Sequence, residues 1–333
     1  MFGLKVKKED AERIREKLIA DSVLDLDYKV KRSKNHIIFP ITSKLEYENA
    51  VFIETEFEPY PKQETDIKEI LKKDLSKKQL DTLQTSYDVI GTIAIIKIPK
   101  ELQDKKKIIG KAVLKTSPGV KTVLEKADKV GGIYRVPSLT YIIGEKTFET
   151  THVEYGVRVK LDVSKVYFSP RLGNERKRIA DLVKAKDAVC VMFSGCGVYN
   201  ILIGKHSKAN KVIGVEINPV GHKYAQENKK INKQPDLKFY LGDVTDVMPS
   251  FENRFDKIVM PLPKNSEDFL NLAINSTSEG GMIYLYRFLD EKEVDDFAKK
   301  LKDIQEVKDI INIEICGDHS PGVHRYCFDI KIQ

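Results

Sequence analysis

The stretch that decides the fold is AVCVMFSGCGVYNILIGKHSKANKVIGVEINP, residues 188–219. Its first apolar run has the length of a buried strand and ends in a turn that contains Gly195 and Gly197. A helical segment follows, and a second apolar run ends at Glu216. Glycines at such a turn allow a tight bend and a close approach of the backbone to a ligand. The stretch therefore predicts a βαβ unit with a binding site at its first turn.

The alternation of strands and helices continues toward the C-terminus, which is typical of a doubly wound, mostly parallel sheet. The last two strand-like runs, 307–317 and 324–332, are joined by a turn containing Ser-Pro-Gly and predict a closing antiparallel hairpin. We therefore expect residues 151–333 to form an α/β domain around a seven-stranded sheet. Its other expected strands include 236–243, 257–262 and 280–288.

Two small α/β domains are expected to precede this sheet. Residues 1–57 have the pattern of a strand, a helix and a hairpin. Residues 58–66 are polar and contain two prolines, which is typical of a linker. Residues 67–150 form the middle domain, in which we expect one helix over 67–83 and one buried strand over 88–99.

Composition narrows the class of protein. The chain has 333 residues, enough for two or three domains, and a net charge of +7, which is compatible with a nucleic-acid partner. No apolar run approaches the roughly 20 residues of a membrane span, and the N-terminus lacks a signal-peptide core. We therefore expect a cytoplasmic protein. The four cysteines lack zinc-site spacing, so we expect buried, reduced thiols and no metal.

Four consecutive strands end in residues suited to a nucleotide. Glu216 follows Gly195 by about twenty residues, the spacing of a carboxylate that binds ribose hydroxyls. Asp243 ends the third strand and could accept a hydrogen bond from an adenine amino group, and Pro261 ends the fourth. Each residue also has a plainer role, since the glycines can serve the turn alone and the acids can cap helices. Their coincidence at one sheet edge favours a nucleotide site.

Two nucleotide classes fit such an edge. A dinucleotide dehydrogenase needs a third glycine in its fingerprint, and Asn200 occupies that position. The closing antiparallel hairpin suits a class I S-adenosyl-L-methionine methyltransferase better. The chemistry agrees, because a methyl sulfonium is a strong electrophile and the enzyme mainly positions it and removes a proton from the acceptor.

The motifs around this edge are more specific. The segment from Phe168 to Arg176 reads FSPRLGNER and stands shortly before the glycine turn. Together with MFSGCG at 192–197, GVEINP at 214–219 and MPLPK at 260–264, it resembles the archaeal and eukaryotic tRNA guanosine-37 N1-methyltransferases. The resemblance spans nearly the whole chain. It implies a class I methyltransferase domain behind two smaller domains, with S-adenosyl-L-methionine as cofactor and tRNA as substrate.

The resemblance also implies residue roles. Glu175 matches the general base that takes the N1 proton of guanine, and Arg135 matches an arginine that stabilises charge developing on O6. The two roles are chemically compatible, because deprotonating N1 moves negative charge onto O6. Taken alone, Glu175 would be an acid favoured in the first turn of a helix, and Arg135 a member of a surface ion pair. The resemblance further implies that Phe193, Ile217 and Val244 line the cofactor site.

Two positions depart from the family pattern. Val191 stands where an aspartate usually supports the methionine end of the cofactor. Pro261 replaces an asparagine, so the fourth strand ends in Pro261-Leu262-Pro263-Lys264, and proline offers no side-chain hydrogen bond to a base. Pro-Leu-Pro resembles an archaeal branch in the wyosine pathway, some of whose enzymes also methylate the tricyclic 4-demethylwyosine. We therefore expect this strand end to shape the base pocket, although it could serve only as a tight turn.

The target base must leave the anticodon-loop stack to be methylated. Tyr167, Phe168 and Tyr199 are aromatic side chains that could stack on it, although each could equally be part of the core. Pro263 and Lys264 are expected beside the same base. The resemblance implies that residues 1–57 contact the tRNA elbow and that the protein is a monomer.

Two other functions remain open from the sequence. A non-catalytic tRNA-binding protein on a decayed methyltransferase fold is slightly favoured by Val191 and opposed by Glu175 and Arg135. A methyltransferase for another RNA, or for a protein, is opposed by the N-terminal domain and by the FSPRLGNER motif.

Overall fold

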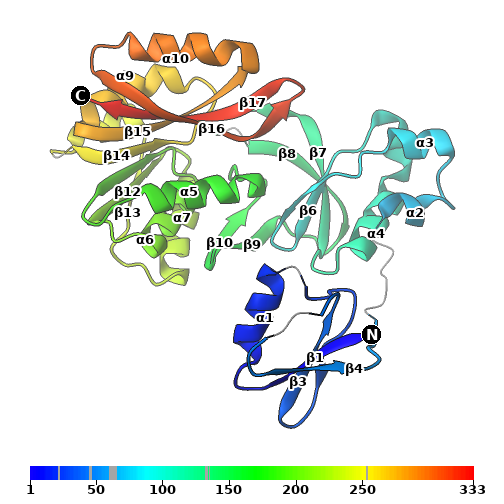
Figure 1. The fold of residues 1–333 in the computed structure, drawn as a ribbon. Coiled ribbons are helices and arrows are strands. Elements are labelled where there is room, and N and C mark those ends of the chain that lie inside the picture. Colours follow the sequence, from blue (N-terminus) through cyan, green and yellow to red (C-terminus); the bar gives the residue numbers. More distant parts are fainter. Residues whose placement is uncertain (22, 45–46, 60–65, 132–133, 135, 253) are drawn as a thin grey trace. The chain divides into compact units, whose positions relative to one another are not determined.

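The computed structural model describes residues 1–21, 23–44, 47–59, 66–131, 134, 136–252 and 254–333. The chain divides into two compact units, Met1–Asp66 and Ile67–Gln333 (Figure 1). Each unit has hydrophobic clusters of its own, so each is described by itself.

The first unit is a four-stranded antiparallel sheet with the strand order β2-β3-β1-β4. Its core joins Leu4 and Val6 of the central strand to Ile14 and Leu18 of the helix. The start of the expected linker belongs to this unit, because Pro59 pairs with residue 28. The elements are β1 (Phe2–Lys7), α1 (Ala11–Ala20), β2 (Lys31–Arg32), β3 (His36–Ile41) and β4 (Ala50–Glu54).

The second unit opens with a four-stranded sheet in the order β5-β6-β7-β8. The strand β6 pairs in parallel with β7, and the connection between them carries α4. The elements are α2 (Ile67–Leu71), α3 (Lys77–Thr82), β5 (Asp88–Ile90), β6 (Ile93–Ile96), η1 (Lys100–Lys105), α4 (Lys106–Thr116), β7 (Thr122–Gly131) and β8 (Val136–Gly144).

Two predictions for this region are wrong. The single helix expected over 67–83 is two helices, because Ser76 and Gln79 form a capping box that starts α3 anew. The single strand expected over 88–99 is the antiparallel pair β5 and β6, since Gly91 turns the chain with a φ of +55°. A side chain at Gly91 would lie 2.3 Å from Thr150 Oγ1, so only glycine fits there.

A two-stranded antiparallel sheet, β9 (Glu149–Glu154) and β10 (Val157–Asp162), leads into the large sheet. This seven-stranded sheet has the order β13-β12-β11-β14-β15-β17-β16. The first five strands in that order run parallel, and β17 is antiparallel to both of its neighbours. The predicted mostly parallel seven-stranded sheet with a closing antiparallel hairpin is therefore confirmed. Its strands are β11 (Ala188–Met192), β12 (Lys211–Glu216), β13 (Lys238–Leu241), β14 (Phe255–Met260), β15 (Thr277–Asp290), β16 (Val307–Ser320) and β17 (Val323–Ile332).

Helices cover both faces of the large sheet, with α5, α6 and α7 on one face and α9 and α10 on the other (Figure 1). The central strand β11 alternates accordingly, because Val189 and Val191 pack into one cluster and Cys190 and Met192 into the other. The helices are η2 (Pro170–Leu172), α5 (Gly173–Leu182), α6 (Val198–His206), α7 (Pro219–Ile231), α8 (Val244–Val247), η3 (Met248–Ser250), η4 (Ser266–Phe269), α9 (Leu270–Ser276), η5 (Glu291–Glu293) and α10 (Val294–Lys302).

Within the described residues, no helix has both the length and the apolar character needed to cross a membrane. All four cysteines are free thiols, and three of them, Cys190, Cys196 and Cys327, are buried.

Candidate active site

The glycine turn lies at the carboxyl end of β11, where the sequence places it. Gly195 and Gly197 both have positive φ, +57° and +80°. A Cβ added at Gly195 would meet nothing closer than the carbonyl oxygen of Tyr167, at 3.9 Å. The backbone of Gly195 is therefore open to close approach by a ligand, and residue 167 lies near the turn. Phe193 also has a positive φ, and its ring packs edge-on against Phe269 at 5.0 Å between centroids.

Glu216 ties the glycine turn to the next strand end. Its Oε2 accepts a hydrogen bond from the backbone N–H of Gly195 at 2.6 Å, and its Oε1 accepts one from Asn218 N–H at 2.8 Å. Burial raises the pKa of Glu216, and these two backbone hydrogen bonds partly offset the rise. Each oxygen keeps a second acceptor position, so the carboxylate can still receive the hydroxyls of a ribose.

The neighbouring strand ends differ in accessibility. Ile217 is 39% exposed and offers an apolar surface directly after Glu216. Asp243 is the N-cap of α8, and its Oδ1 accepts from the backbone N–H and the hydroxyl of Thr245. The cap occupies one oxygen and leaves Oδ2 for an amino group. Val244 is 3% exposed, so its side chain belongs to the core.

The fourth strand end is a rigid turn tied to β15. The N–H of Leu262 donates to Met260 at 2.7 Å across Pro261, a three-residue turn that the fixed φ of proline favours. The carbonyl of Pro263 accepts from Phe288 N–H at 3.3 Å. Pro261 and Pro263 are half-buried and Lys264 is exposed. This turn is therefore held against the residues that follow Leu285 in β15.

Glu175 is connected to the strand beside this turn through Tyr286. In the register, Leu285 pairs with Met260, so the adjacent residue, Tyr286, lies beside the Pro261 turn. The Tyr286 hydroxyl donates to Glu175 Oε1 at 2.5 Å. Glu175 is only 5% exposed and also receives two hydrogen bonds from Arg178, one turn further along α5. Tyr286 therefore links the buried carboxylate of Glu175 to the strand that pairs with the end of β14.

Arg176, the last residue of the FSPRLGNER motif, fixes the motif to β9. Arg176 is fully buried and donates to both oxygens of Glu154 at 2.6 Å and to the carbonyl of Ser169. Burial raises the pKa of Glu154, but hydrogen bonds from His152 and Arg176 outweigh it and leave the pKa below its ordinary value. The Phe168 ring packs between His152, 5.2 Å away, and the Arg176 guanidinium, 4.9 Å away.

Tyr167 is more accessible than Phe168, the aromatic residue that follows it. It is 45% exposed, and its hydroxyl accepts a hydrogen bond from Arg325 of β17 at 3.0 Å. Tyr199, in contrast, is buried, and its hydroxyl donates to Tyr286 at 3.2 Å. Tyr199 is therefore part of the core and not a stacking surface. Arg135 lies outside the described residues.

Three matches with known protein families cover the chain in series. The TRM5/TYW2 methyltransferase domain matches residues 150–315, the TYW2 N-terminal domain residues 67–147, and the tRNA methyltransferase 5 N-terminal domain residues 3–49. The chain belongs to the TRM5/TYW2 family.

Individual relatives resemble all or most of the chain. A tRNA (guanine(37)-N(1))-methyltransferase Trm5b from Pyrococcus abyssi is 36% identical over 100% of this chain and 99% of its own length. A tRNA (guanine(37)-N(1))/4-demethylwyosine(37)-methyltransferase Taw22 from Nanoarchaeum equitans is 33% identical over 74% of this chain and 99% of its own length. The solved complex of aTrm5 and tRNALeu has a TM-score of 0.73 at 29% identity and covers both chains fully.

The candidate site contains residues that the sequence did not point to. Arg178 and Tyr286 hydrogen-bond Glu175, and Asp329 pairs with Arg178, yet Asp329 is 151 positions from Arg178 and no local pattern links them. The Phe288 ring stacks on His319 at 3.9 Å between centroids, and the Arg325 guanidinium lies over the Phe288 ring, 5.0 Å from its centroid. The predicted hairpin could have pointed to these residues, because it brings β17 alongside β15.

The geometry of the glycine turn fits S-adenosyl-L-methionine. The open backbone at Gly195 and the remaining acceptor positions on Glu216 suit a ribose, and Ile217 supplies an apolar surface. Ser194 Oγ, in the same turn, is buried without a hydrogen-bond partner among the described atoms. Val191 is fully buried in an apolar cluster and offers no polar contact. The methionine end of the cofactor must therefore be held by other groups.

Proposed function

We propose that this protein transfers the methyl group of S-adenosyl-L-methionine to N1 of guanosine 37 in tRNA. The observation that carries the proposal is the buried carboxylate of Glu175, which accepts a hydrogen bond from Tyr286, one residue beyond the Leu285–Met260 pair at the carboxyl end of β14. Full-length similarity to enzymes that carry the corresponding name supports the substrate.

The cofactor would bind at the glycine turn. Gly195 and Glu216 would hold its ribose, Asp243 and Ile217 its adenine, and Phe193 would close the end of the site. Bound there, S-adenosyl-L-methionine supplies a methyl group on a positively charged sulfur. The chain's own task is to orient the acceptor base and to remove its proton.

Glu175 is the proposed general base. Its carboxylate is hydrogen-bonded by Arg178 and can receive the N1 proton of guanine at Oε2, which has the fewer hydrogen bonds. Arg135 is the proposed donor to O6 on the opposite edge of the base, a role that rests on the sequence motif alone. Glu175→Gln is expected to lower the single-turnover rate about 10²–10⁴-fold, the range for a general base.

The target base would lie between Tyr167 and the Pro261–Lys264 turn. Tyr167 is half-exposed, whereas the Phe168 ring already packs against Arg176, so Tyr167 is the proposed stacking partner. Pro261 and Pro263 offer flat apolar surfaces and no side-chain hydrogen bond. Such a pocket depends less on the amino edge of guanine, so we propose that it also accepts the tricyclic base 4-demethylwyosine.

Methyl transfer to two purified tRNAs tests both activities. One tRNA carries guanosine 37 and the other 4-demethylwyosine 37, and the enzymes are the wild type, Pro261→Asn and a matched control, Pro249→Asn, at an exposed proline in η3. We expect the wild type and the control to modify both tRNAs and Pro261→Asn to keep only guanosine 37. Because the cofactor carries other groups on its sulfur, mass spectrometry should identify the group transferred.

Other outcomes would favour other functions. Wild type that modifies guanosine 37 alone, with an unchanged Pro261→Asn variant, would limit the enzyme to one activity and reduce the prolines to a turn. Tight tRNA binding without any transfer, at millimolar S-adenosyl-L-methionine, would make the protein a non-catalytic tRNA-binding protein. Equal transfer to unrelated RNAs would exclude position-37 specificity.

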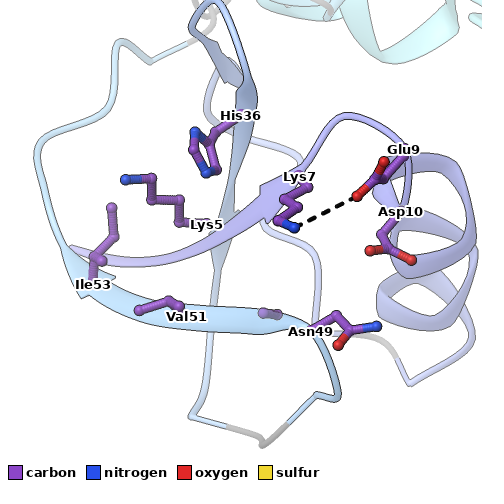
Figure 2. A pocket seen from close by; sticks show the side chains of 9 residues that line it. Lys5, Lys7, Glu9, Asp10, His36, Asn49, Val51 and Ile53 are labelled. Carbon is purple, nitrogen blue, oxygen red and sulfur yellow. Dashed lines mark ion pairs between the residues drawn. The ribbon is translucent and has the colours of Figure 1, made fainter.

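The first unit offers a surface for a second tRNA contact. The exposed face of its sheet forms a hollow of about 530 Å³ between β1, β3, β4 and the start of α1. Figure 2 shows Lys5 and His36 in this hollow, with the ion pair of Lys7 and Glu9 at its edge, 3.7 Å from Nζ to Oε1. Cations on a half-apolar surface suit a phosphate backbone that is recognised by shape. We propose that this face contacts the tRNA elbow.

Comparing full-length tRNA with an isolated anticodon stem-loop distinguishes the proposed elbow contact from the contact at the anticodon loop. The double variant Lys5→Ala/Lys7→Ala should weaken the reaction with full-length tRNA and leave the reaction with an isolated anticodon stem-loop unchanged. An equal effect on both substrates would remove the elbow assignment.

We propose that residues 1–57 contact the tRNA elbow and that residues 58–66 are a linker. Residues 67–150 would make further RNA contacts, and residues 151–333 would carry out catalysis. We further propose that the protein acts as a monomer in the cytoplasm, and sedimentation with and without tRNA measures its oligomeric state.

A further inference from the structure

The carboxylate of Glu175 is hydrogen-bonded by groups from two elements. Its Oε1 accepts from the Tyr286 hydroxyl at 2.5 Å and from Arg178 Nη2 at 2.9 Å. Its Oε2 accepts from Arg178 Nε at 2.7 Å. A carboxylate has about four acceptor positions, and three of them are filled by described groups. The remaining position is on Oε2, which is where an incoming N–H group would bind.

Arg178 is shared between two carboxylates. Its Nη1 donates to Asp329 Oδ2 at 2.7 Å and its Nη2 to Asp329 Oδ1 at 3.1 Å, while Nε and Nη2 serve Glu175. Burial lowers the pKa of Arg178, but the hydrogen bonds to Glu175 and Asp329 outweigh it and leave the pKa raised. The three side chains together carry one net negative charge.

This arrangement matters at the moment when Glu175 takes a proton. If Arg178 faced Glu175 alone, protonation would leave a partly buried cation without a counter-charge, which is costly. With Asp329 in place, Arg178 stays paired and the cluster becomes neutral. Asp329 therefore keeps a counter-charge beside Arg178 when Glu175 takes the proton.

Tyr286 acts in the opposite direction. Its single hydroxyl proton is directed to Glu175, because its oxygen accepts the proton of Tyr199 at 3.2 Å. A hydrogen bond to a carboxylate favours the ionised form. Burial raises the pKa of Tyr286 well above its ordinary value, so the hydroxyl stays a donor. The titratable and charged groups that face this cluster are Arg176 and Arg178 on α5, Tyr199 on α6, Tyr284 and Tyr286 on β15, Cys316 on β16, and Cys327 and Asp329 on β17.

We propose that Arg178, Asp329 and Tyr286 are positioning residues that set the proton affinity of Glu175 and direct its Oε2 toward the substrate. This inference rests on the proposed function of Glu175. In the step itself the N1–H bond of the base breaks and an O–H bond forms at Oε2. The base nitrogen then forms its bond to the methyl carbon as the carbon–sulfur bond breaks, and the electron pair of that bond stays on sulfur.

The test is the pH dependence of single-turnover methyl transfer with excess full-length enzyme. Asp329→Asn removes one negative charge beside Arg178, so the acid limb of the profile should move to lower pH by about one unit and the plateau rate should fall about tenfold. Tyr286→Phe removes a hydrogen bond to the ionised form, so its acid limb should move to higher pH. Asp309→Asn, at an exposed position of the same hairpin, is the matched control and should keep the wild-type profile.

Opposite shifts for the two variants support the inference, because loss of structure alone would lower the plateau without moving the acid limb. Wild-type acid limbs for both Asp329→Asn and Tyr286→Phe would overturn it, and so would shifts in the same direction. Tyr286→Phe preserves shape, so it remains informative if Asp329→Asn fails to fold. Near-normal rates for Glu175→Gln would instead remove the general base itself. Failure of the positioning role and failure of the proposed function are therefore distinguishable.

Discussion

Two glycines in one turn are expected to respond to the same substitution in different ways. Gly195 and Gly197 both occupy the left-handed region, which costs an alanine about 1–2 kcal/mol in folding stability. A methyl group at Gly197 would also lie 2.8 Å from the ring of Phe239 and 3.1 Å from Ala225 Cβ. Relieving that overlap costs about 1–3 kcal/mol more. At Gly195 the space is open, since Tyr167 O is the only described atom beyond the adjacent residues that would lie within 4 Å of the methyl group.

We therefore expect Gly197→Ala to lower the free energy of unfolding by about 2–5 kcal/mol and Gly195→Ala by only about 1–2 kcal/mol. The open space at Gly195 is where the cofactor is proposed to approach the backbone. Gly195→Ala should therefore weaken binding of S-adenosyl-L-methionine about tenfold or more, equivalent to about 1.4 kcal/mol. Urea denaturation measures the stabilities, and calorimetric titration of the folded variants measures the affinities.

The result that would refute this reasoning is wild-type affinity in a folded Gly195→Ala variant. The glycine turn would then serve only the chain, and the cofactor would have to bind elsewhere. Equal stability losses for the two variants would show that the contact with Phe239 relaxes without cost.

Three further predictions concern the framework around the site. Arg176→Met should destabilise the fold by about 3–5 kcal/mol in urea denaturation, because it leaves the buried Glu154 without its bidentate partner. The pKa of Glu154 is lowered in the folded state, so its stabilising contribution is complete above the ordinary value of 4.5 and is lost as the pH falls below it. The stability difference between wild type and Glu154→Gln should therefore shrink on acidification, and a constant difference would contradict this. Arg171→Ala breaks an exposed 2.7 Å pair with Asp88 and should cost less than about 1 kcal/mol, so a larger loss of stability would mean that this pair holds the middle sheet in place.

The sequence predicts the sheet well because its signals are local. Each strand of the parallel sheet is an apolar run followed by a turn, and the alternation of Val189, Cys190, Val191 and Met192 between two clusters follows from the pleat. Such patterns need no knowledge of distant residues. The glycine turn was predictable for the same reason.

Predictions failed where a short-range signal was overlooked or where the contact is long-range. The capping box of Ser76 and the turn at Gly91 are local features that the longer hydrophobic pattern concealed. The partners of Glu175 are of another kind, because Tyr286 lies 111 positions away in the chain. Only the register of β15 against β14 brings it beside the Pro261 turn, and that register is a property of the folded sheet.

Two arginines of α5, Arg176 at the end of the FSPRLGNER motif and Arg178 two positions later, have different partners. Residues two positions apart point to opposite sides of a helix, and residues three apart share a side. Arg176 therefore points to Glu154 of β9, whereas Arg178 shares its side with Glu175 and points to Asp329 of β17. Two arginines two positions apart can thus fix the helix to two different sheets while only one contacts the candidate base. A lysine at either position would supply charge without the bidentate geometry that both carboxylates receive. The spacing of the two arginines, and not their number, is what lets one helix pair with Glu154 and with Asp329.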